Sequence, residues 1–215
     1  MRTYGLIGLA LSALLFSIPL CGKVCSTNPS DTELPIEDII IGDLEVKSPV
    51  EVFVYTAFSC THCSQFHKIL QELIDHYKTN PNVRFVLRDF PIDKISLQAA
   101  LLARLNHKED YLRIANTFFD KQDAWLSAKD PLSALKKIVI DLGIPSQEVE
   151  KALTNKKTET QLLTRCVDGI KQYKIDSTPT VVVHDKIIRY AADLKELITL
   201  VDKELKKKEL KKAGS

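Results

Sequence analysis

A strongly apolar run, Val50–Phe58, is followed directly by two closely spaced cysteines and then by a helical pattern. The run predicts a strand that is buried on both of its faces. After Cys63 the apolar residues recur with the spacing of one helix face, and Val83–Leu87 predicts a further strand, parallel to the first. The cysteines then lie at the carboxyl end of a buried strand, where open α/β sheets place their functional sites. The predicted helix face consists of Phe66, Ile69, Leu70, Leu73, Ile74 and Tyr77.

Cys60 and Cys63 enclose Thr61 and His62, and this spacing is typical of a redox-active dithiol. At the start of a helix the first thiol faces unpaired N–H groups and the positive end of the helix dipole, which lower its pKa. Cys60 is therefore the candidate nucleophile, and a stabilised thiolate makes the corresponding disulfide an oxidant. Zinc binding is the alternative use of such a pair. No second Cys or His pair follows at the required spacing, and we expect no metal.

The rest of the chain predicts an α/β fold with a thioredoxin-like order of elements. Ile36–Ile41 predicts a first strand, and residues 94–174 show helical patterns only, which indicates an inserted helical subdomain. Residues 36–93 and 175–208 then form the thioredoxin-like domain. Its second part contains the strands Thr180–His184 and Ile187–Tyr190, a turn at Asp185-Lys186, and a helix from about Asp193. The helices expected in the insertion are Leu97–Leu105, Tyr111–Phe119, Leu132–Leu142, Val149–Leu153 and Leu162–Tyr173.

Residues 1–26 predict a secretory signal peptide, because Arg2 precedes an apolar run of limited length. An uncleaved membrane anchor is the alternative. Residues 27–35 are polar, carry two prolines and predict a linker. Without the signal peptide the chain has as many acidic as basic residues, so nucleic acid is not an expected partner. Lysines gather at the end of the last helix, and residues 209–215 predict a basic tail. Contact with anionic lipid headgroups is the alternative to a solvated helix end.

The chain has five cysteines, and an odd count with one close pair favours a catalytic disulfide over a structural framework. Cys21 and Cys25 lie at the signal boundary, whereas Cys166 lies in the insertion. We expect Cys166 to be a buried free thiol, with an intermolecular bridge as the alternative. Trp125 is expected in the core of the insertion. The apolar face predicted around Cys166 consists of Leu162, Leu163, Val167 and Ile170.

Four ordered blocks of sequence resemble the DsbA family, particularly its alphaproteobacterial branch. The resemblance covers roughly Ile36–Lys203 and is far more specific than the cysteine pair alone. The blocks are Cys60–His67, Phe85–Pro91, Lys121–Trp125 and Ser177–Thr180.

The resemblance implies a thioredoxin fold with a helical insertion and a periplasmic thiol-disulfide oxidoreductase that a DsbB-like membrane protein re-oxidises. Cys60 would attack and form the mixed disulfide, Cys63 would resolve it, and Thr61 and His62 would tune the thiolate. Thr178-Pro179 resembles the family's cis-proline loop, which would bind an extended substrate segment. The redox-active disulfide Cys60–Cys63 would make a separate cofactor unnecessary.

Three departures from the family pattern affect this transfer. The positions of the family's second disulfide correspond to Leu105 and Ala152, so that bridge is absent. Val54 replaces a buried acid that helps to move the proton of the resolving thiol, and neither Glu51 nor Asp89 is an obvious substitute. Thr61 replaces the proline of the family's usual Cys-Pro-His-Cys motif. The threonine before the cis-proline occurs in both oxidases and isomerases, so Thr178 leaves the direction of exchange open.

The hypothesis from sequence is an enzyme, a monomer in the periplasm, that introduces disulfide bonds into cysteine-containing exported proteins. A disulfide isomerase or reductase with the same site is the first alternative, and a non-enzymatic peptide-binding or zinc-binding module is the second. We further predict that water or the dithiol itself carries the Cys63 proton. The Val54→Glu variant tests this prediction, because an unchanged pH dependence of exchange would show that the missing acid does not matter.

Overall fold

The computed structural model describes residues 38–105, 108–190 and 193–213, all of which belong to the compact unit formed by residues 35–215. The predicted signal peptide and linker, together with Cys21 and Cys25, lie outside the described residues. Within the described residues no helix is long and apolar enough to cross a membrane.

The centre of the fold is a mixed sheet with the strand order β1-β3-β2-β4-β5. β2 and β3 are parallel, which confirms the prediction from the strand-helix-strand pattern, and the other neighbouring strands are antiparallel. β2 is central and is hydrogen-bonded to a strand on each side, with Val54 opposite Leu87 and Val181. The strands are β1 (Ile39–Ile41), β2 (Val50–Thr56), β3 (Val83–Asp89), β4 (Thr180–Val183) and β5 (Lys186–Arg189).

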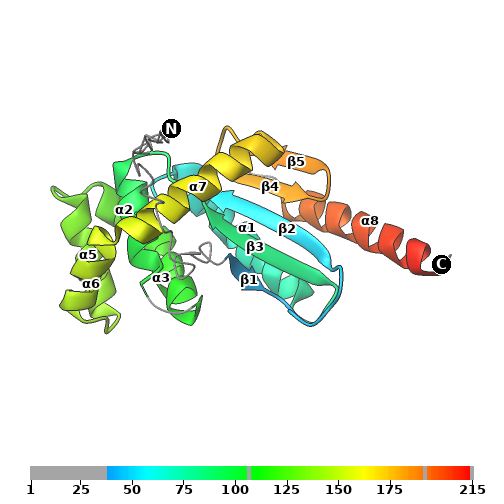
Figure 1. The fold of residues 1–215 in the computed structure, drawn as a ribbon, viewed down its shortest axis with the longest axis horizontal. Coiled ribbons are helices and arrows are strands. Elements are labelled where there is room, and N and C mark those ends of the chain that lie inside the picture. The colour runs from blue at the N-terminus through cyan, green and yellow to red at the C-terminus, as the bar shows by residue number, and fades with distance from the viewer. Residues whose placement is uncertain (1–37, 106–107, 191–192, 214–215) are drawn as a thin grey trace, which may run out of the picture. The chain divides into compact units, whose positions relative to one another are not determined.

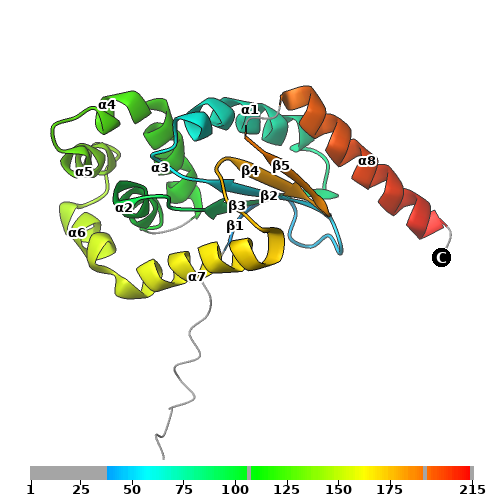
Figure 2. The same ribbon diagram turned by 90° about the horizontal axis from the view of Figure 1, so that it is seen from above.

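Helices cover both faces of this sheet, as Figure 2 shows with the sheet seen from its edge. On one face α1 (Thr61–Tyr77) and α8 (Leu194–Ala213) pack against the side chains of Val52 and Val54. On the other face α7 (Lys156–Tyr173) lies across the strands and packs against β2 through Tyr55 (Figure 1). Burial on both sides explains why the β2 sequence is apolar throughout and not alternating.

Between β3 and β4 the described chain forms only helices. Their core contains Trp125, which is 1% exposed and donates its indole N–H to the carbonyl oxygen of Phe118 at 2.8 Å. This confirms the prediction for Trp125. Asp93 and Asp130 accept hydrogen bonds from backbone N–H groups and so begin α2 and α5. The helices before α7 are α2 (Lys94–Ala103), α3 (Lys108–Asp120), α4 (Gln122–Leu126), α5 (Pro131–Asp141) and α6 (Ser146–Thr154).

The face of α7 that packs on the sheet differs from the predicted one. Cys166 and Leu162 are buried, as expected, and Gly169 continues their side of the helix. The prediction for the other apolar residues was wrong, because two apolar stripes run side by side on this helix and periodicity alone does not select the buried one. The exposed stripe consists of Leu163, Val167 and Ile170, each about half exposed.

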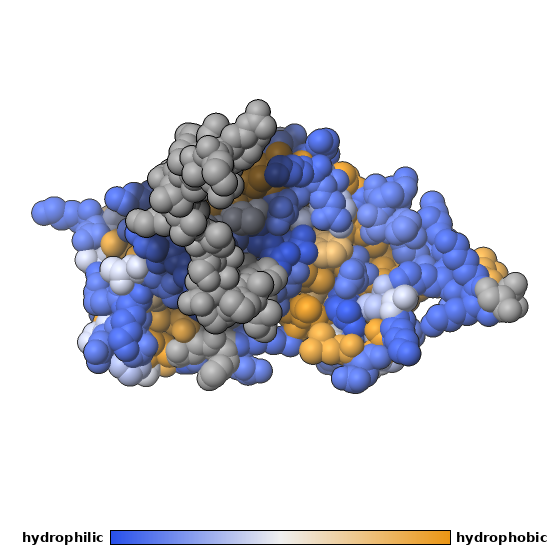
Figure 3. Space-filling model, in the orientation of Figure 1, coloured by the Kyte–Doolittle hydropathy of each residue, from blue (hydrophilic) through white to orange (hydrophobic). Residues whose placement is uncertain are grey.

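Two further boundaries differ from the sequence prediction. The turn between β4 and β5 lies at His184-Asp185, one residue earlier than predicted, and His184 adopts a left-handed conformation with φ of 56°. β5 accordingly begins at Lys186. α8 continues to Ala213, so residues 209–213 of the expected basic tail are helical. The surface over this end of α8 is mostly hydrophilic (Figure 3).

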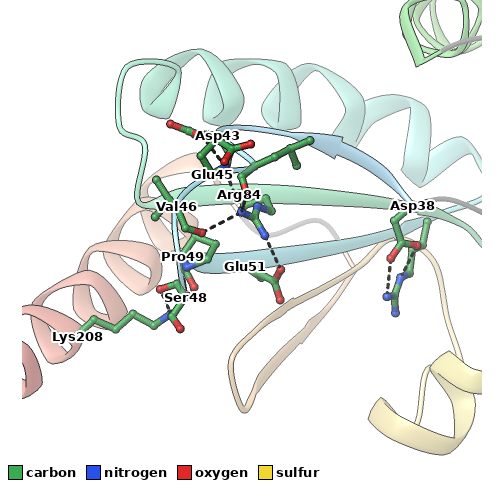
Figure 4. Close-up of polar contacts among 11 residues, drawn as sticks. Asp38, Asp43, Glu45, Val46, Ser48, Pro49, Glu51, Arg84 and Lys208 are labelled. Carbon is green, nitrogen blue, oxygen red and sulfur yellow. Dashed lines mark hydrogen bonds and ion pairs between the residues drawn. The ribbon is translucent and has the colours of Figure 1, made fainter.

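Two basic side chains hold the loop between β1 and β2 from opposite sides (Figure 4). Arg84 Nη2 donates to the carbonyl oxygens of Asp43, Leu44 and Val46 at 2.8, 3.3 and 3.2 Å. Lys208 Nζ of α8 donates to the carbonyl oxygens of Ser48 and Pro49. The Arg84 contacts tie this loop to β3, and the Lys208 contacts tie it to the C-terminal helix.

Candidate active site

Cys60 and Cys63 lie where the central strand β2 ends and α1 begins. A turn joins the two elements, and Cys60 N donates to the carbonyl oxygen of Ala57 at 3.1 Å. Cys60 is the N-cap residue of α1, and its own carbonyl oxygen accepts the hydrogen bonds of Cys63 N and Ser64 N at 3.0 and 3.2 Å. Cys60 is partly exposed whereas Cys63 is fully buried, and both are free thiols. An incoming thiolate can therefore reach only Cys60.

The environment of Cys60 favours its thiolate. A hydrogen bond from the Cys63 thiol is the largest cause that lowers the pKa of Cys60, and the backbone N–H groups of Cys63 and His62 at the helix start lower it further. Partial burial opposes this effect. The resulting pKa of Cys60 is about 5, far below the ordinary value of 9.0.

Cys63 shows the opposite behaviour. Burial raises the pKa of its thiol, and the hydrogen bond to Cys60 raises it further. The backbone N–H of Ala57 donates to Cys63 Sγ at 3.5 Å and only partly offsets these effects. Val54 is 1% exposed within an apolar cluster with Phe66 and Leu70. The family's buried acid has no carboxylate counterpart at this position.

The structure brings Thr178 and Pro179, which are far from the cysteine pair in sequence, close to the Cys60 thiol. The Cys60 thiol donates to the carbonyl oxygen of Thr178 at 3.3 Å, and the Thr178-Pro179 peptide bond is cis. Both residues lie just before β4, the strand next to β2. The loop before β4 thus lies beside Cys60 Sγ.

Thr61 and His62 occupy the first turn of α1 with exposed side chains. Among the hydrogen bonds of the described residues, none joins either side chain to Cys60 Sγ. Instead, the backbone N–H groups of His62 and Cys63 lower the pKa of Cys60. The side chains of Thr61 and His62 face solvent, where an incoming polypeptide would meet them.

Gln122 is a residue of the site that the sequence reasoning did not single out. Its side chain is 2% exposed, and its amide donates to the carbonyl oxygens of Phe58 and Cys60 at 2.7 and 2.9 Å. Gln122 belongs to Lys121–Trp125, a sequence block that resembles the DsbA family, and this was the only sequence feature that set it apart from other glutamines. The role itself was not visible, because its acceptors are backbone carbonyl groups.

The helical insertion also holds α1 directly. Ser64 Oγ donates to the carbonyl oxygen of Phe119 at 3.0 Å, and His67 Nε2 lies 2.9 Å from Asn116 Oδ1. Burial lowers the pKa of His67, so this ring is neutral at physiological pH. In addition, Ser59 Oγ donates to Asp93 Oδ2, the cap of α2, at 2.8 Å. Together with Gln122 of α4, these contacts mean that α3, α4 and the cap of α2 all hold the turn or the helix that carries the cysteines.

The remaining predicted positions lie away from the cysteine pair. Cys166 is a buried free thiol, as expected, and burial raises its pKa to about 11. Leu105 and Ala152, which the sequence resemblance matches to the family's second disulfide, line a cavity of about 200 Å³ in the insertion. The described residues contain no cluster of three or more His, Cys, Asp or Glu side chains that could hold a metal ion.

Comparison with known proteins agrees with this geometry. A family model described as thioredoxin matches residues 35–203. A proposed protein-disulfide oxidoreductase of Rickettsia prowazekii is 29% identical over 149 residues, which are 68% of this chain and 54% of that protein. One of Rickettsia felis is 28% identical over 177 residues, which are 81% of this chain and 62% of that protein. The chain thus spans between half and two thirds of the length of these relatives.

Solved structures share the fold. Wolbachia pipientis alpha-DsbA1 superposes with a TM-score of 0.73 at 24% identity, and the match covers 83% of this chain and 96% of that one. The family match extends over most of the described residues and includes the cysteine pair and the cis-proline loop. The chain therefore belongs to the thioredoxin family, and its fold resembles that of Wolbachia alpha-DsbA1.

Proposed function

We propose that this protein is a thiol-disulfide oxidoreductase that introduces disulfide bonds into cysteine-containing exported proteins. The asymmetry between Cys60 and Cys63 carries the proposal. A thiolate at Cys60 with a pKa of about 5 stabilises the reduced protein, and a stable reduced form makes the disulfide a strong oxidant. Thiols of low pKa also leave faster in disulfide exchange, which favours the release of Cys60 from a mixed disulfide.

The proposed reaction has two steps. A substrate thiolate attacks Sγ of Cys60 in the Cys60–Cys63 disulfide, the S–S bond breaks, and Cys63 leaves with the electron pair and takes up a proton. A second substrate thiolate then attacks the substrate sulfur of the mixed disulfide and releases Cys60 as a thiolate. Two substrate thiols are oxidised to a disulfide, and the protein disulfide is reduced to a thiol and a thiolate.

The position of Thr178 supports a role in binding the substrate. Its carbonyl oxygen lies 3.3 Å from Cys60 Sγ at the end of the loop before β4. A main-chain segment that pairs with this loop in extended form would place its own cysteine beside Cys60. Such recognition uses backbone groups and so accepts clients of different sequence.

The rest of the proposal concerns where and with what the protein acts. We propose a periplasmic monomer, exported by the segment predicted at residues 1–26, that a DsbB-like membrane protein re-oxidises after each turnover. A Rickettsia relative is named a protein-disulfide oxidoreductase and Wolbachia alpha-DsbA1 shares the fold, which supports the redox activity on which this assignment depends. Fractionation of cells that express the full chain tests the location.

The test of function is the equilibrium of the purified protein with reduced and oxidised glutathione. We expect the wild-type protein to remain largely reduced at glutathione ratios that fully oxidise a reducing thioredoxin, and to catalyse oxidative folding of a reduced model protein. The Cys60→Ser variant is the control and should be inactive. A redox potential near that of reducing thioredoxins would favour the reductase or isomerase alternative. An unchanged thiol count on oxidation, together with stoichiometric zinc, would overturn the enzymatic proposal.

A further inference from the structure

Gln122 connects the helical insertion to the turn that carries Cys60. It is the first residue of α4, and one nitrogen, Nε2, donates to two carbonyl oxygens of that turn, at Phe58 and Cys60. The two acceptors flank Ser59, so both ends of the turn are held by a single amide. At 2% exposure the side chain has no solvent to replace these hydrogen bonds.

The helix that carries Gln122 is held firmly in place. Trp125, one turn further along α4, is anchored by its hydrogen bond to the carbonyl oxygen of Phe118 and is almost fully buried. α3, which precedes α4, is tied to α1 through Ser64 and the carbonyl oxygen of Phe119. The donor is therefore fixed relative to the same helix whose N-terminus faces the reactive sulfur.

The acceptor at Cys60 has a direct link to the chemistry. The carbonyl oxygen of Cys60 already accepts from Cys63 N and Ser64 N, and these bonds start α1. A third donor on this oxygen fixes the orientation of the peptide group that follows Cys60. It also draws electron density from a carbonyl dipole next to the sulfur, and so reduces the negative potential that a thiolate meets there.

We propose that Gln122 is a positioning residue for the redox pair: its amide holds the Phe58–Cys60 turn so that Cys60 Sγ stays at the start of α1, where the backbone N–H groups of His62 and Cys63 face it. The effect favours the reduced protein over the oxidised one, because only the reduced protein carries a thiolate. The inserted subdomain thereby contributes to the oxidising strength of the site without touching the substrate. This inference rests on the proposed role of Cys60 and Cys63 as the redox pair.

The test compares Gln122→Met with the wild type, because methionine has a similar volume and no donor. We expect the pKa of Cys60, measured by the ultraviolet absorbance of its thiolate, to rise by about half a unit to one unit. The glutathione equilibrium should move about three- to tenfold toward the protein disulfide, as expected for the loss of the hydrogen bond to the Cys60 carbonyl oxygen, which is the one of the two lost bonds that lies next to the sulfur. The reduced protein should lose more resistance to denaturant than the oxidised protein.

Two matched variants remove other hydrogen bonds of the insertion. Trp125→Phe loses the indole donor in the same short helix, and Ser64→Ala loses the bond from α1 to α3. Both remove support for Gln122 but leave its amide in place, so we expect them to weaken the oxidised and reduced proteins to a similar degree and to shift the pKa of Cys60 and the glutathione equilibrium much less than Gln122→Met does. An equal shift in Trp125→Phe and Gln122→Met would overturn the inference, because general loosening would then explain it.

A second substitution guards against misfolding of Gln122→Met. Gln122→Glu keeps the shape, loses the donors when ionised and adds a negative charge, so it should move both redox measurements in the same direction. Wild-type values in a folded Gln122→Met or Gln122→Glu protein would overturn the inference. If the wild-type protein itself forms no Cys60–Cys63 disulfide, the proposed function fails. If the wild type forms it and the variants match the wild type, only the role of Gln122 fails.

Discussion

Cys60 and Cys63 are separated by two residues, yet their thiols have opposite environments. The helix start places backbone N–H groups and the second thiol around Cys60, whereas the second thiol itself is buried beneath the turn. One hydrogen bond between the two sulfurs therefore lowers one pKa and raises the other. This division makes one cysteine the accessible thiolate and the other a protonated partner.

The reduced protein should react with iodoacetamide at Cys60 in mildly acidic solution, because the pKa of this thiol is about 5. We expect the alkylation rate to rise with pH around a midpoint near that value. Cys63 and Cys166 should stay unlabelled at neutral pH, since burial raises the pKa of both thiols. Mass spectrometry identifies the labelled residue, and Cys60→Ser is the control. A midpoint near 9.0, the ordinary value, would contradict the assignment.

The cysteine pair and the cis-proline loop were predictable from the sequence, whereas hydrogen bonds to particular backbone carbonyl groups were not. The cysteine spacing and the Thr178-Pro179 block pointed to the site from the sequence. Gln122 did not, because any glutamine can donate to a carbonyl oxygen and only the folded chain shows which oxygen is within reach. The same limit applies to the hydrogen bond between Cys60 and Thr178, since each lies on a different element.

At the scale of elements, the insertion docks on the sheet through a buried ion pair. Asp89 at the end of β3 accepts from Arg104 Nε at 2.6 Å and from the Tyr111 hydroxyl at 2.8 Å. The sequence identified Asp89 as a nearby acid, but its partners depend on how α2 and α3 pack. Their positions follow from tertiary contacts that helical periodicity does not encode.

Removal of Asp89 takes the carboxylate partner from the buried Arg104 and the acceptor from the buried Tyr111 hydroxyl. The side chains of Asp89 and Arg104 are 2% and 8% exposed. We therefore expect Asp89→Ala to lower the free energy of unfolding by about 3–5 kcal/mol. Asp141→Ala breaks an exposed pair with Lys137 and should cost less than about 0.5 kcal/mol. Denaturant unfolding measures both, and equal effects would show that burial of the first pair has no energetic consequence.

Gly169 allows α7 to approach the sheet closely. A Cβ atom at this position would lie 2.8 Å from Tyr55 Cε1, and Tyr55 cannot turn away easily because Arg88 Nη1 donates to its hydroxyl at 2.9 Å. The sequence predicted a helix here and gave no sign that a glycine on its buried face was needed. That need arises only from the distance between the helix and a tyrosine more than a hundred residues earlier.

Gly169→Ala should lower the free energy of unfolding, although alanine favours the helix over glycine by about 1 kcal/mol. The overpacking against Tyr55 costs about 1–3 kcal/mol and outweighs that gain. Lys171→Ala, an exposed position on the same helix, should change stability by less than about 0.5 kcal/mol. A more stable Gly169→Ala protein would show that α7 moves outward without penalty.

At the scale of the whole molecule, the fold order and the parallel β2–β3 pair followed from the sequence because each depends on local patterns and handed connections. The buried face of α7 and the contacts of the insertion did not follow from the sequence, since they depend on which surfaces meet in the folded chain.

The redox state of the Cys60–Cys63 pair affects the stability of the whole molecule. In a two-state protein any group that titrates differently in the folded and unfolded chain changes the stability of the whole.

We expect the reduced protein to gain stability relative to the oxidised protein as pH rises from about 5 to about 9. In the folded reduced protein the pKa of Cys60 is depressed from 9.0 to about 5, so between these values the unfolded chain binds more protons. This stabilisation is fully present above the unfolded pKa and is lost as pH falls through the folded pKa. The oxidised protein has no thiol at Cys60, and Cys166 is present in both forms, so its contribution cancels.

The slope of this difference stays below about 1.4 kcal/mol per pH unit, the limit for one proton, because Cys60 is partly exposed and water screens its interactions. Above about pH 9 the gain should end, since Cys63 ionises in the unfolded reduced chain while burial keeps it protonated in the folded one. Denaturant unfolding of both redox forms across this range measures the difference. Relative to the oxidised wild-type protein, the Cys60→Ser variant should gain no stability between pH 5 and 9. A stability difference that is independent of pH in the wild type would mean that the folded protein does not stabilise the Cys60 thiolate, and the proposed oxidising strength would lose its physical basis.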